Sequence, residues 1–222
     1  MLAWEIVERA VTAGGTELTL ARRGQEWVVR AAGQVLMSSR SHGSEETLVK
    51  YALERVKGPR HVLVGGLGLG FTLRAALDQL PHSVPIQVVE LVPELIEWNR
   101  THVADLARRP LEDRRVVVQT GDVHGVIASC NATLDLLLLD VDNGPAALTQ
   151  GKNARLYSEA GARACARALQ VGGVLALWSA GPDERYRKNL GLAGLVVEMK
   201  TVAARPGKGA RDVLFLARRP PG

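Results

Sequence analysis

Apolar and polar positions follow two different spacings along the chain. Before residue 43 the alternation has a period of two and is interrupted by single glycines, which is typical of short antiparallel strands joined by tight turns. A helical spacing follows over Ser44–Val56, with Ser44 as its cap and Lys57-Gly58-Pro59 as its end signal. The predicted strands of this first region are Glu17–Arg22, Gln25–Arg30 and Gln34–Ser38.

From Arg60 onward, apolar runs typical of buried strands alternate with helical patterns. Leu134–Leu139 is apolar at nearly every position, as expected of a central parallel strand covered on both faces. The pattern predicts a doubly wound α/β fold with a mostly parallel, seven-stranded sheet, whose last two strands form an antiparallel hairpin at one edge. The predicted strands are His61–Gly65, Ile86–Glu90, Arg115–Thr120, Leu134–Asp140, Val174–Ser179, Val196–Val202 and Val213–Ala217. The predicted helices are Phe71–Gln79, Pro93–Asp105, Tyr157–Leu169 and Asp183–Leu190.

The length and composition fit one full domain with a small appendage, because 222 residues with a 46% hydrophobic share can bury a sizeable core. We expect an N-terminal β-meander over residues 1–42, a linking helix over 43–58 and a Rossmann-like domain over 59–222. No apolar run reaches the ~20 residues that cross a bilayer, and the first residues do not resemble a signal peptide. Cys130 and Cys165 are too few for a disulfide framework or a zinc site. A cytoplasmic protein without a metal is therefore predicted.

The net charge of +5 comes from one end of the chain. Lys200–Gly222 contains six basic residues and one acidic residue, and the rest of the chain is balanced, with 22 residues of each sign. A basic segment can bind phosphates, but no nucleic-acid module or base-handling motif accompanies this one. Nucleic-acid binding is therefore disfavoured, and a small-molecule partner is expected.

The segment Val62–Leu77 carries the first chemical signal. A short apolar run ends in three alternate glycines, Gly66, Gly68 and Gly70, and a helical pattern follows. Glycines let the backbone pass close to a ligand, and the start of a helix offers free N–H donors. Such a turn between a strand and a helix predicts a site for a nucleotide or nucleoside.

Three acids stand at the ends of the next three predicted strands, where ligands bind in such sheets. Glu90 can accept both ribose hydroxyl hydrogens, or it can cap the following helix. Asp122, after Gly121, can accept an adenine amino hydrogen, or it can be the N-cap of a short helix. Asp140 can face the reacting end of the ligand, or it can organise a tight turn at Asn143-Gly144. Their order and spacing favour an adenosyl ligand over a whole dinucleotide.

These residues resemble the spermidine/spermine synthase family, which are polyamine aminopropyltransferases built on the class I S-adenosylmethionine methyltransferase fold. The resemblance runs from about Trp27 to Trp178. It includes the glycine turn followed by Thr72-Leu73-Arg74, VVELVPELIEWNR (Val88–Arg100), Gly121-Asp122, DVDNGPAAL and LYSEAGARACARALQVGGVLAL.

The resemblance implies transfer of an aminopropyl or other alkyl group from an adenosyl sulfonium to an amine. The family's carboxylate that orients the amine and takes its proton matches Asp140. Two candidate substrate residues each have a structural alternative. Tyr157 can close over the site, or it can simply begin a helix. Trp178 can line the acceptor pocket, or it can pack in the core. The chemistry needs no metal, and the family makes a homodimer plausible.

The chain also departs from the family pattern. Leu69 stands where the glycine turn usually has an Asp that attracts the ammonium of decarboxylated S-adenosylmethionine. Asn143 replaces the second Asp of the loop after the fourth strand; it cannot act as a carboxylate base and is a candidate substrate contact. Glu45, Glu46 and Tyr51 do not match the family's spacing well, so that the predicted site is short of acids for a polyamine.

Two further functions therefore stay open. The first is a methyltransferase that uses S-adenosylmethionine itself on a substrate other than a polyamine. The second is a nucleoside-binding protein of the same fold that has no turnover and acts as a sensor or partner subunit. Both would keep the pocket of Gly66, Gly68, Gly70, Glu90, Gly121 and Asp122.

Overall fold

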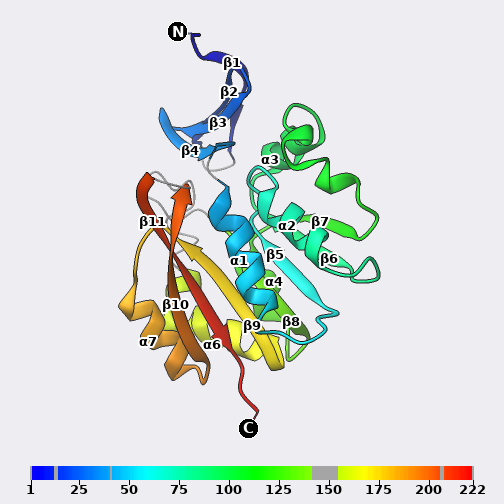
Figure 1. The fold of residues 1–222 in the computed structure, drawn as a ribbon, viewed down its shortest axis with the longest axis vertical. Helices are drawn as coiled ribbons and strands as arrows, with labels where there is room; N and C mark the ends of the chain where they lie inside the picture. Colours follow the sequence, from blue (N-terminus) through cyan, green and yellow to red (C-terminus); the bar gives the residue numbers. More distant parts are fainter. Residues whose placement is uncertain (1, 13–14, 41, 142–154, 206–207, 222) are drawn as a thin grey trace.

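Two separate β-sheets organise the chain in the computed structural model, which describes residues 2–12, 15–40, 42–141, 155–205 and 208–221 (Figure 1). The smaller sheet is antiparallel, has the order β1-β2-β3-β4 and lies at the top of Figure 1. Its strands are β1 (Glu5–Val11), β2 (Glu17–Arg23), β3 (Glu26–Ala31) and β4 (Gln34–Ser38).

The prediction of a meander is thus confirmed, but β1 was missed. Most side chains of β1 are exposed or half-buried, so that its sequence lacks the alternation that a half-buried strand shows. β1 is held instead by its antiparallel pairing with β2 and by surface ion pairs such as that of Arg22 with Glu5.

The larger sheet has seven strands in the order β10-β11-β9-β8-β5-β6-β7. The strands from β9 to β7 are parallel, whereas β11 runs antiparallel to both β9 and β10, so that the terminal hairpin occupies one edge. The predicted α/β fold with a mostly parallel seven-stranded sheet is confirmed. The strands are β5 (Val62–Gly65), β6 (Ile86–Glu90), β7 (Val116–Thr120), β8 (Leu134–Leu139), β9 (Leu169–Ser179), β10 (Val196–Arg205) and β11 (Lys208–Arg218).

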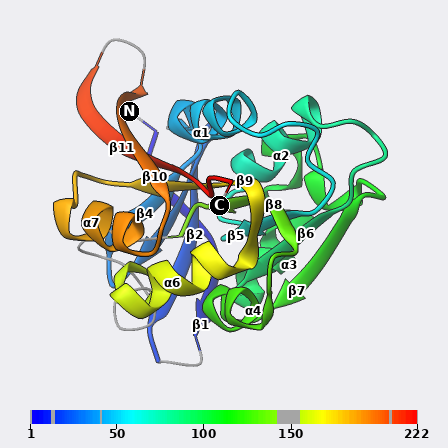
Figure 2. The same ribbon diagram turned by 90° about the horizontal axis from the view of Figure 1, so that it is seen from below.

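Helices cover both faces of this sheet, as the view from below shows (Figure 2). α1 and α2 pack on one face, around Leu48, Leu73 and Leu136. α4, α6 and α7 pack on the other, around Ile127, Leu137 and other buried residues. The helices are α1 (Gly43–Leu53), α2 (Phe71–Gln79), α3 (Pro93–Arg100), α4 (Val123–Ser129), α6 (Glu159–Ala168) and α7 (Glu184–Leu192).

Several predicted boundaries need correction. The last two strands are longer than predicted, since β10 ends at Arg205 rather than Val202 and β11 begins at Lys208 rather than Val213. The helix from Pro93 ends at Arg100 and not at the predicted Asp105, and a separate 3₁₀ helix follows over Ala104–Ala107. β9 begins at Leu169, five residues before the predicted Val174, because pairing with β8 extends to Leu134 through an irregular register.

The small sheet packs over the carboxyl ends of the large one. Leu18, Leu20 and Val29 share a buried cluster with Leu69 of the glycine turn and Trp98 of α3. β4 therefore lies above the turn that follows β5, which is where the sequence predicts a ligand.

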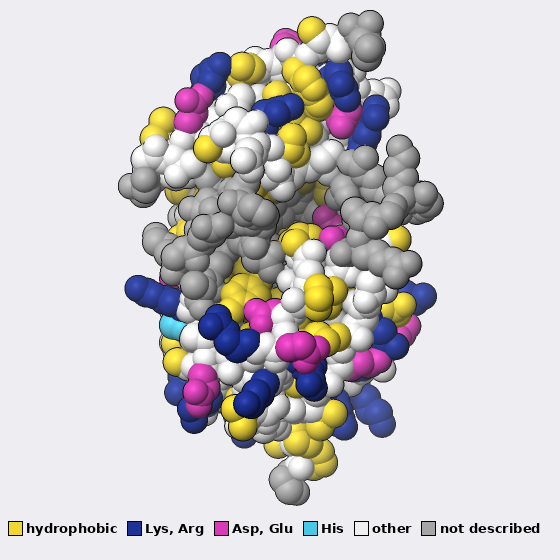
Figure 3. Space-filling model, turned by 90° about the vertical axis from the view of Figure 1, so that its left-hand side faces the viewer, with side chains coloured by type: hydrophobic (Ala, Val, Ile, Leu, Met, Phe, Trp, Pro, Cys, Tyr) yellow, Lys and Arg dark blue, Asp and Glu magenta, His cyan; other side chains and the backbone are white. Residues whose placement is uncertain are grey.

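Charges are mixed on the face drawn in Figure 3, where Lys and Arg side chains are interspersed with acidic ones. Lys200, at the start of the basic C-terminal segment, pairs with Glu198. In the described part of the chain, no helix combines the length and the apolar character needed to cross a membrane.

Candidate active site

The turn between β5 and α2 brings two strand ends into backbone contact. Gly66 has φ +89°, and a Cβ there would lie 2.2 Å from the carbonyl oxygen of Asp140. No side chain fits in that space, so this glycine is required by the approach of the chain after β8. Gly68 also has a positive φ, +54°, and faces the Met37 sulfur of β4.

Gly70 has a different role from the other two glycines. It is the N-cap of α2, and a Cβ there would lie 2.9 Å from the Asn99 side-chain oxygen. The Asn99 amide nitrogen donates hydrogen bonds to the carbonyl oxygens of Gly68 and Leu95, each at 2.8 Å. Asn99 was not identified from the sequence, although a buried amide in an amphipathic helix was a usable signal. It fixes the glycine turn to α3.

Glu90, at the end of β6, is 6% exposed. Its Oε2 accepts a hydrogen bond from the Leu67 backbone N–H at 2.7 Å, and its Oε1 accepts one from the Val92 N–H at 2.8 Å. Burial raises the pKa of Glu90, and the surrounding backbone N–H groups act in the opposite direction. This carboxylate therefore ties the glycine turn to the loop before α3.

Asp122 caps α4, because its Oδ1 accepts a hydrogen bond from the His124 backbone N–H at 2.9 Å. Asp122 is therefore the N-cap that the sequence offered as an alternative to adenine binding. The residue also lines the cavity described below. Gly121 donates its N–H to the Glu90 carbonyl oxygen at 2.8 Å, which holds the ends of β6 and β7 together.

We call the small hollow at these strand ends the turn cavity. Its volume is about 60 Å³. Its lining includes Gly66, Gly68, Glu90, Gly121 and Asp122, together with Leu36 and Met37 of β4. Five of the six predicted nucleoside-binding residues therefore meet at one place, and the sixth, Gly70, packs against Asn99, Ala107 and Pro110 instead.

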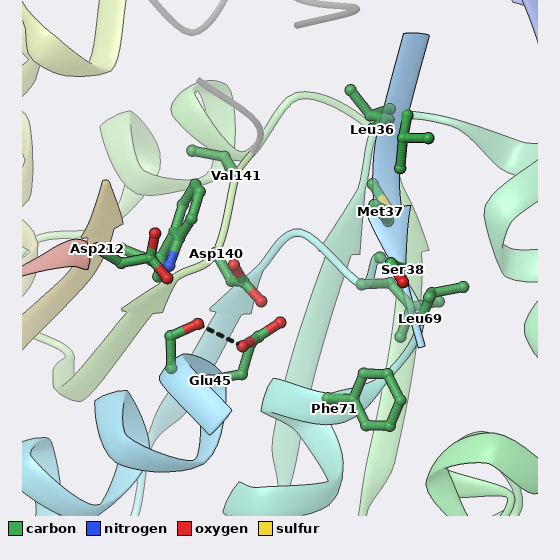
Figure 4. Close-up of a pocket in the computed structure, with 14 residues that line it drawn as sticks. Leu36, Met37, Ser38, Glu45, Leu69, Phe71, Asp140, Val141 and Asp212 are labelled. Carbon is green, nitrogen blue, oxygen red and sulfur yellow. Dashed lines mark hydrogen bonds between the residues drawn. The ribbon is translucent and has the colours of Figure 1, made fainter. Parts of the chain in front are cut away.

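A larger hollow of about 310 Å³ adjoins the turn cavity, and we call it the acidic cavity. Its two sides differ, as Figure 4 shows: Glu45, Asp140 and Asp212 project from one side, and apolar side chains of β4, the glycine turn and α2 from the other. The two cavities share part of their lining, namely Leu36, Met37, Gly68, Asp140 and Val141.

Asp140 follows β8 and lies where the two cavities join. Its backbone N–H donates to the Gly65 carbonyl oxygen at 2.9 Å. Its Oδ2 accepts a hydrogen bond of 2.6 Å from the hydroxyl of Thr72, a buried residue in the first turn of α2. The carboxylate is therefore fixed from both its backbone and its side chain. Asp140 is the predicted catalytic residue, and Thr72 as its holder was not predicted.

The structure corrects the expectation that the site is short of acids. Glu45 reaches the acidic cavity from the first turn of α1, and Asp212 reaches it from β11. The Ser44 hydroxyl donates to Glu45 Oε2 at 2.7 Å (Figure 4). Burial and the nearby Asp140 raise the pKa of Glu45 to about 8. A single acid before the apolar run of the last strand was the available signal for Asp212.

The candidate substrate contacts Tyr157 and Trp178 lie in different surroundings in the structure. Trp178, on β9, lines the acidic cavity, and its buried indole nitrogen has no hydrogen-bond partner within the described ranges. Tyr157 lines neither cavity, and its ring instead lies 4.9 Å from that of Tyr186. Asn143 lies outside the described residues. Among the residues that the structure describes, no group of three or more His, Cys, Asp or Glu side chains is placed to hold a metal ion.

Comparison with known proteins agrees with this geometry. The model of the spermine/spermidine synthase domain matches residues 41–186. The polyamine aminopropyltransferase of Nitrosomonas europaea is 33% identical over 146 residues, which are 65% of this chain and 42% of that protein. The polyamine aminopropyltransferase of Korarchaeum cryptofilum is 29% identical over 137 residues, which are 61% of this chain and 40% of that protein. The match thus spans less than half the length of these curated relatives.

Two solved structures have the same fold. A spermidine synthase in complex with the transition-state analogue AdoDATO superposes with a TM-score of 0.82 at 16% identity, over 96% of this chain and 73% of that one. The spermidine synthase of Thermotoga maritima gives a TM-score of 0.80 at 16% identity, over 96% and 72% of the two chains.

Proposed function

The chain belongs to the spermine/spermidine synthase family, and from this we propose that it is a transferase that moves an aminopropyl group from decarboxylated S-adenosylmethionine to an amine. One observation carries the proposal. Asp140 lies where a cavity lined by glycine backbone joins a cavity lined by carboxylates. A donor in the first cavity and an amine in the second would meet at this residue.

The turn cavity suits the adenosyl part of the donor. Gly66 and Gly68 present backbone without side chains, so that a ligand can approach closely. Glu90 Oε2 and Oε1 accept from the backbone N–H groups of Leu67 and Val92, and the carboxylate lines this cavity, where it can also accept from a ribose hydroxyl. Asp122 uses Oδ1 for its cap, which leaves Oδ2 to accept from an adenine amino group.

The acidic cavity suits the acceptor amine. The bound sulfonium supplies a carbon whose bond to sulfur breaks as the amine nitrogen forms the new bond, and the electron pair leaves with a neutral thioether. Asp140, held by Thr72, accepts a hydrogen bond from the amine and so aims its lone pair at that carbon. The same carboxylate takes the proton that the nitrogen loses. The Phe71 and Trp178 side chains help to exclude water.

A second candidate rests on Leu69. This apolar residue, 5% exposed, lines the acidic cavity and would not repel the carboxylate of S-adenosylmethionine. A methyltransferase would then use the same turn cavity. The carboxylates of Asp140 and Asp212 favour the decarboxylated donor, because each would repel a donor carboxylate in a partly buried space. A binding protein without turnover is the remaining alternative.

Product analysis with each donor tests the proposal. The protein is incubated with decarboxylated S-adenosylmethionine or with S-adenosylmethionine and a panel of mono-, di- and polyamines, and methylthioadenosine and S-adenosylhomocysteine are quantified. We expect methylthioadenosine and an aminopropylated amine from the decarboxylated donor. S-adenosylhomocysteine as the only product would favour the methyltransferase. Binding of both donors with no product from any amine would contradict the aminopropyltransferase.

A further inference from the structure

The three acids of the acidic cavity differ in what already pairs with them. Asp140 accepts from the Thr72 hydroxyl, and Glu45 accepts from the Ser44 hydroxyl. Asp212 is 9% exposed, and none of the described residues donates a hydrogen bond to its side chain or forms an ion pair with it. In Figure 4 Asp212 lies on the same side of the cavity as Glu45 and Asp140.

A buried carboxylate without a partner is unfavourable, because it has lost water and gained nothing in exchange. The surroundings of Asp212 do not relieve this. Leu214 pairs with Trp178 in the β9–β11 register, so that Asp212, two residues before Leu214, lies on the same face diagonally from Trp178. The indole nitrogen of Trp178 is itself buried without a partner among the described residues. Among the described residues, two polar groups from neighbouring strands therefore lack a hydrogen-bond partner at this side of the cavity.

The ligand that satisfies Asp212 is a cation. Glu45 keeps a proton near neutral pH and so carries little charge, whereas Asp140 is assigned to the amine acceptor. On the opposite side, the side chains of Met37, Leu69 and Phe71 are apolar and cannot form an ion pair with an ammonium. Among the described lining residues, Asp212 is then the acid left to pair with a second cationic group beside the acceptor.

We propose that Asp212 pairs with the primary ammonium at the end of the donor's aminopropyl chain and so selects a donor that lacks a carboxylate. This inference rests on the proposed function. It places the cationic end of the donor toward β11, across the cavity from Leu69 (Figure 4). Asp212 is thus a specificity residue, separate from the residues that hold the adenosyl part.

Calorimetric titration of Asp212→Asn tests this assignment, because asparagine keeps the shape and removes the charge. The ligands are decarboxylated S-adenosylmethionine, S-adenosylmethionine and methylthioadenosine, the last of which has no ammonium. We expect the Kd of the decarboxylated donor to rise by about 10- to 100-fold, as for a lost charged hydrogen bond. The Kd of methylthioadenosine stays within about twofold. The preference for the decarboxylated donor over S-adenosylmethionine falls.

Glu159→Gln, at an exposed carboxylate on α6, is the matched control and should change none of these affinities. An unchanged affinity for the decarboxylated donor in Asp212→Asn overturns the assignment, as does equal weakening of methylthioadenosine. An unchanged donor affinity with a raised KM for the acceptor also overturns it and moves Asp212 to the acceptor. Failure of the proposed function looks different, since the wild-type protein would then bind none of the three compounds or transfer aminopropyl to no amine.

Discussion

The turn cavity and the acidic cavity share Asp140 but are built from different materials. The turn cavity is made largely of backbone: glycines with positive φ, strand ends, and a carboxylate, Glu90, that accepts from two backbone N–H groups. The acidic cavity is made of side chains that project from α1, β9, β11 and the chain after β8. The first cavity is therefore fixed by the sheet itself, and the second depends on how distant elements meet.

This difference separates two tasks that one reaction needs. A backbone site tolerates little change, because a side chain at Gly66 would collide with the Asp140 carbonyl. A side-chain site can change its charge one residue at a time without altering the fold. We infer that the turn cavity sets the class of ligand and that the acidic cavity sets which donor and acceptor react.

Asp140→Asn gives the largest expected effect and tests the residue that belongs to both cavities. Asparagine can still accept from the Thr72 hydroxyl, so the fold should survive. It cannot take a proton, so turnover should fall by roughly 10²- to 10⁴-fold. Donor affinity should stay within about tenfold, or ~1.4 kcal/mol. Steady-state product formation and calorimetry measure the two quantities.

The control for that variant is Asp105→Asn, at a side chain that is 83% exposed and lines neither cavity. Its turnover should equal that of the wild type. If Asp140→Asn retains turnover within about threefold, Asp140 has no part in proton transfer, and the donor and the amine do not react beside this residue.

The same contrast decides what the sequence could reveal. The glycine turn, Glu90, Asp122 and Asp140 lie at the ends of successive strands, and the topology of a parallel sheet brings such ends together. The seven-stranded sheet followed from apolar runs for the same reason. Glu45 and Asp212 are 167 positions apart in the chain, and no period relates them. β1 was missed because its exposed side chains leave no pattern. The spacing of residues along the sequence therefore predicted the turn cavity. Glu45 and Asp212 could be placed at the acidic cavity only from the packing of elements that are distant in the sequence.

Glu90→Gln probes the turn cavity and should have an intermediate effect on both stability and binding. The side-chain amide must point its N–H₂ at the backbone N–H of either Leu67 or Val92 and leave that buried donor unsatisfied. The free energy of unfolding should fall by about 1–3 kcal/mol. Donor affinity should fall by about tenfold or more, because ribose loses a charged acceptor.

Urea unfolding and calorimetric titration of the folded variant separate these two effects. Glu97→Gln, at an exposed position of α3, is the matched control. Unaltered donor affinity in Glu90→Gln, together with reduced stability, would leave Glu90 a purely structural carboxylate. The turn cavity would then owe its ligand to backbone alone.

Glu45→Gln tests the electrostatics of the acidic cavity through the pH dependence of stability, with the smallest expected effect per pH unit. Burial and Asp140 raise the pKa of Glu45 from about 4.5 to about 8, so the folded protein keeps a proton that the unfolded chain releases in this range. The free energy of unfolding contributed by this group is therefore full below about pH 4.5 and is lost as pH rises toward about 8. The wild-type protein should lose stability more steeply across this window than Glu45→Gln, by at most about 1.4 kcal/mol per pH unit for one proton.

Urea unfolding at several pH values measures the slopes, and Glu46→Gln, at the exposed neighbour, should match the wild type. Equal slopes in wild type and Glu45→Gln would mean that Glu45 is ionised in the folded protein, so that a cation in the acidic cavity could pair with Glu45 as well as with Asp212.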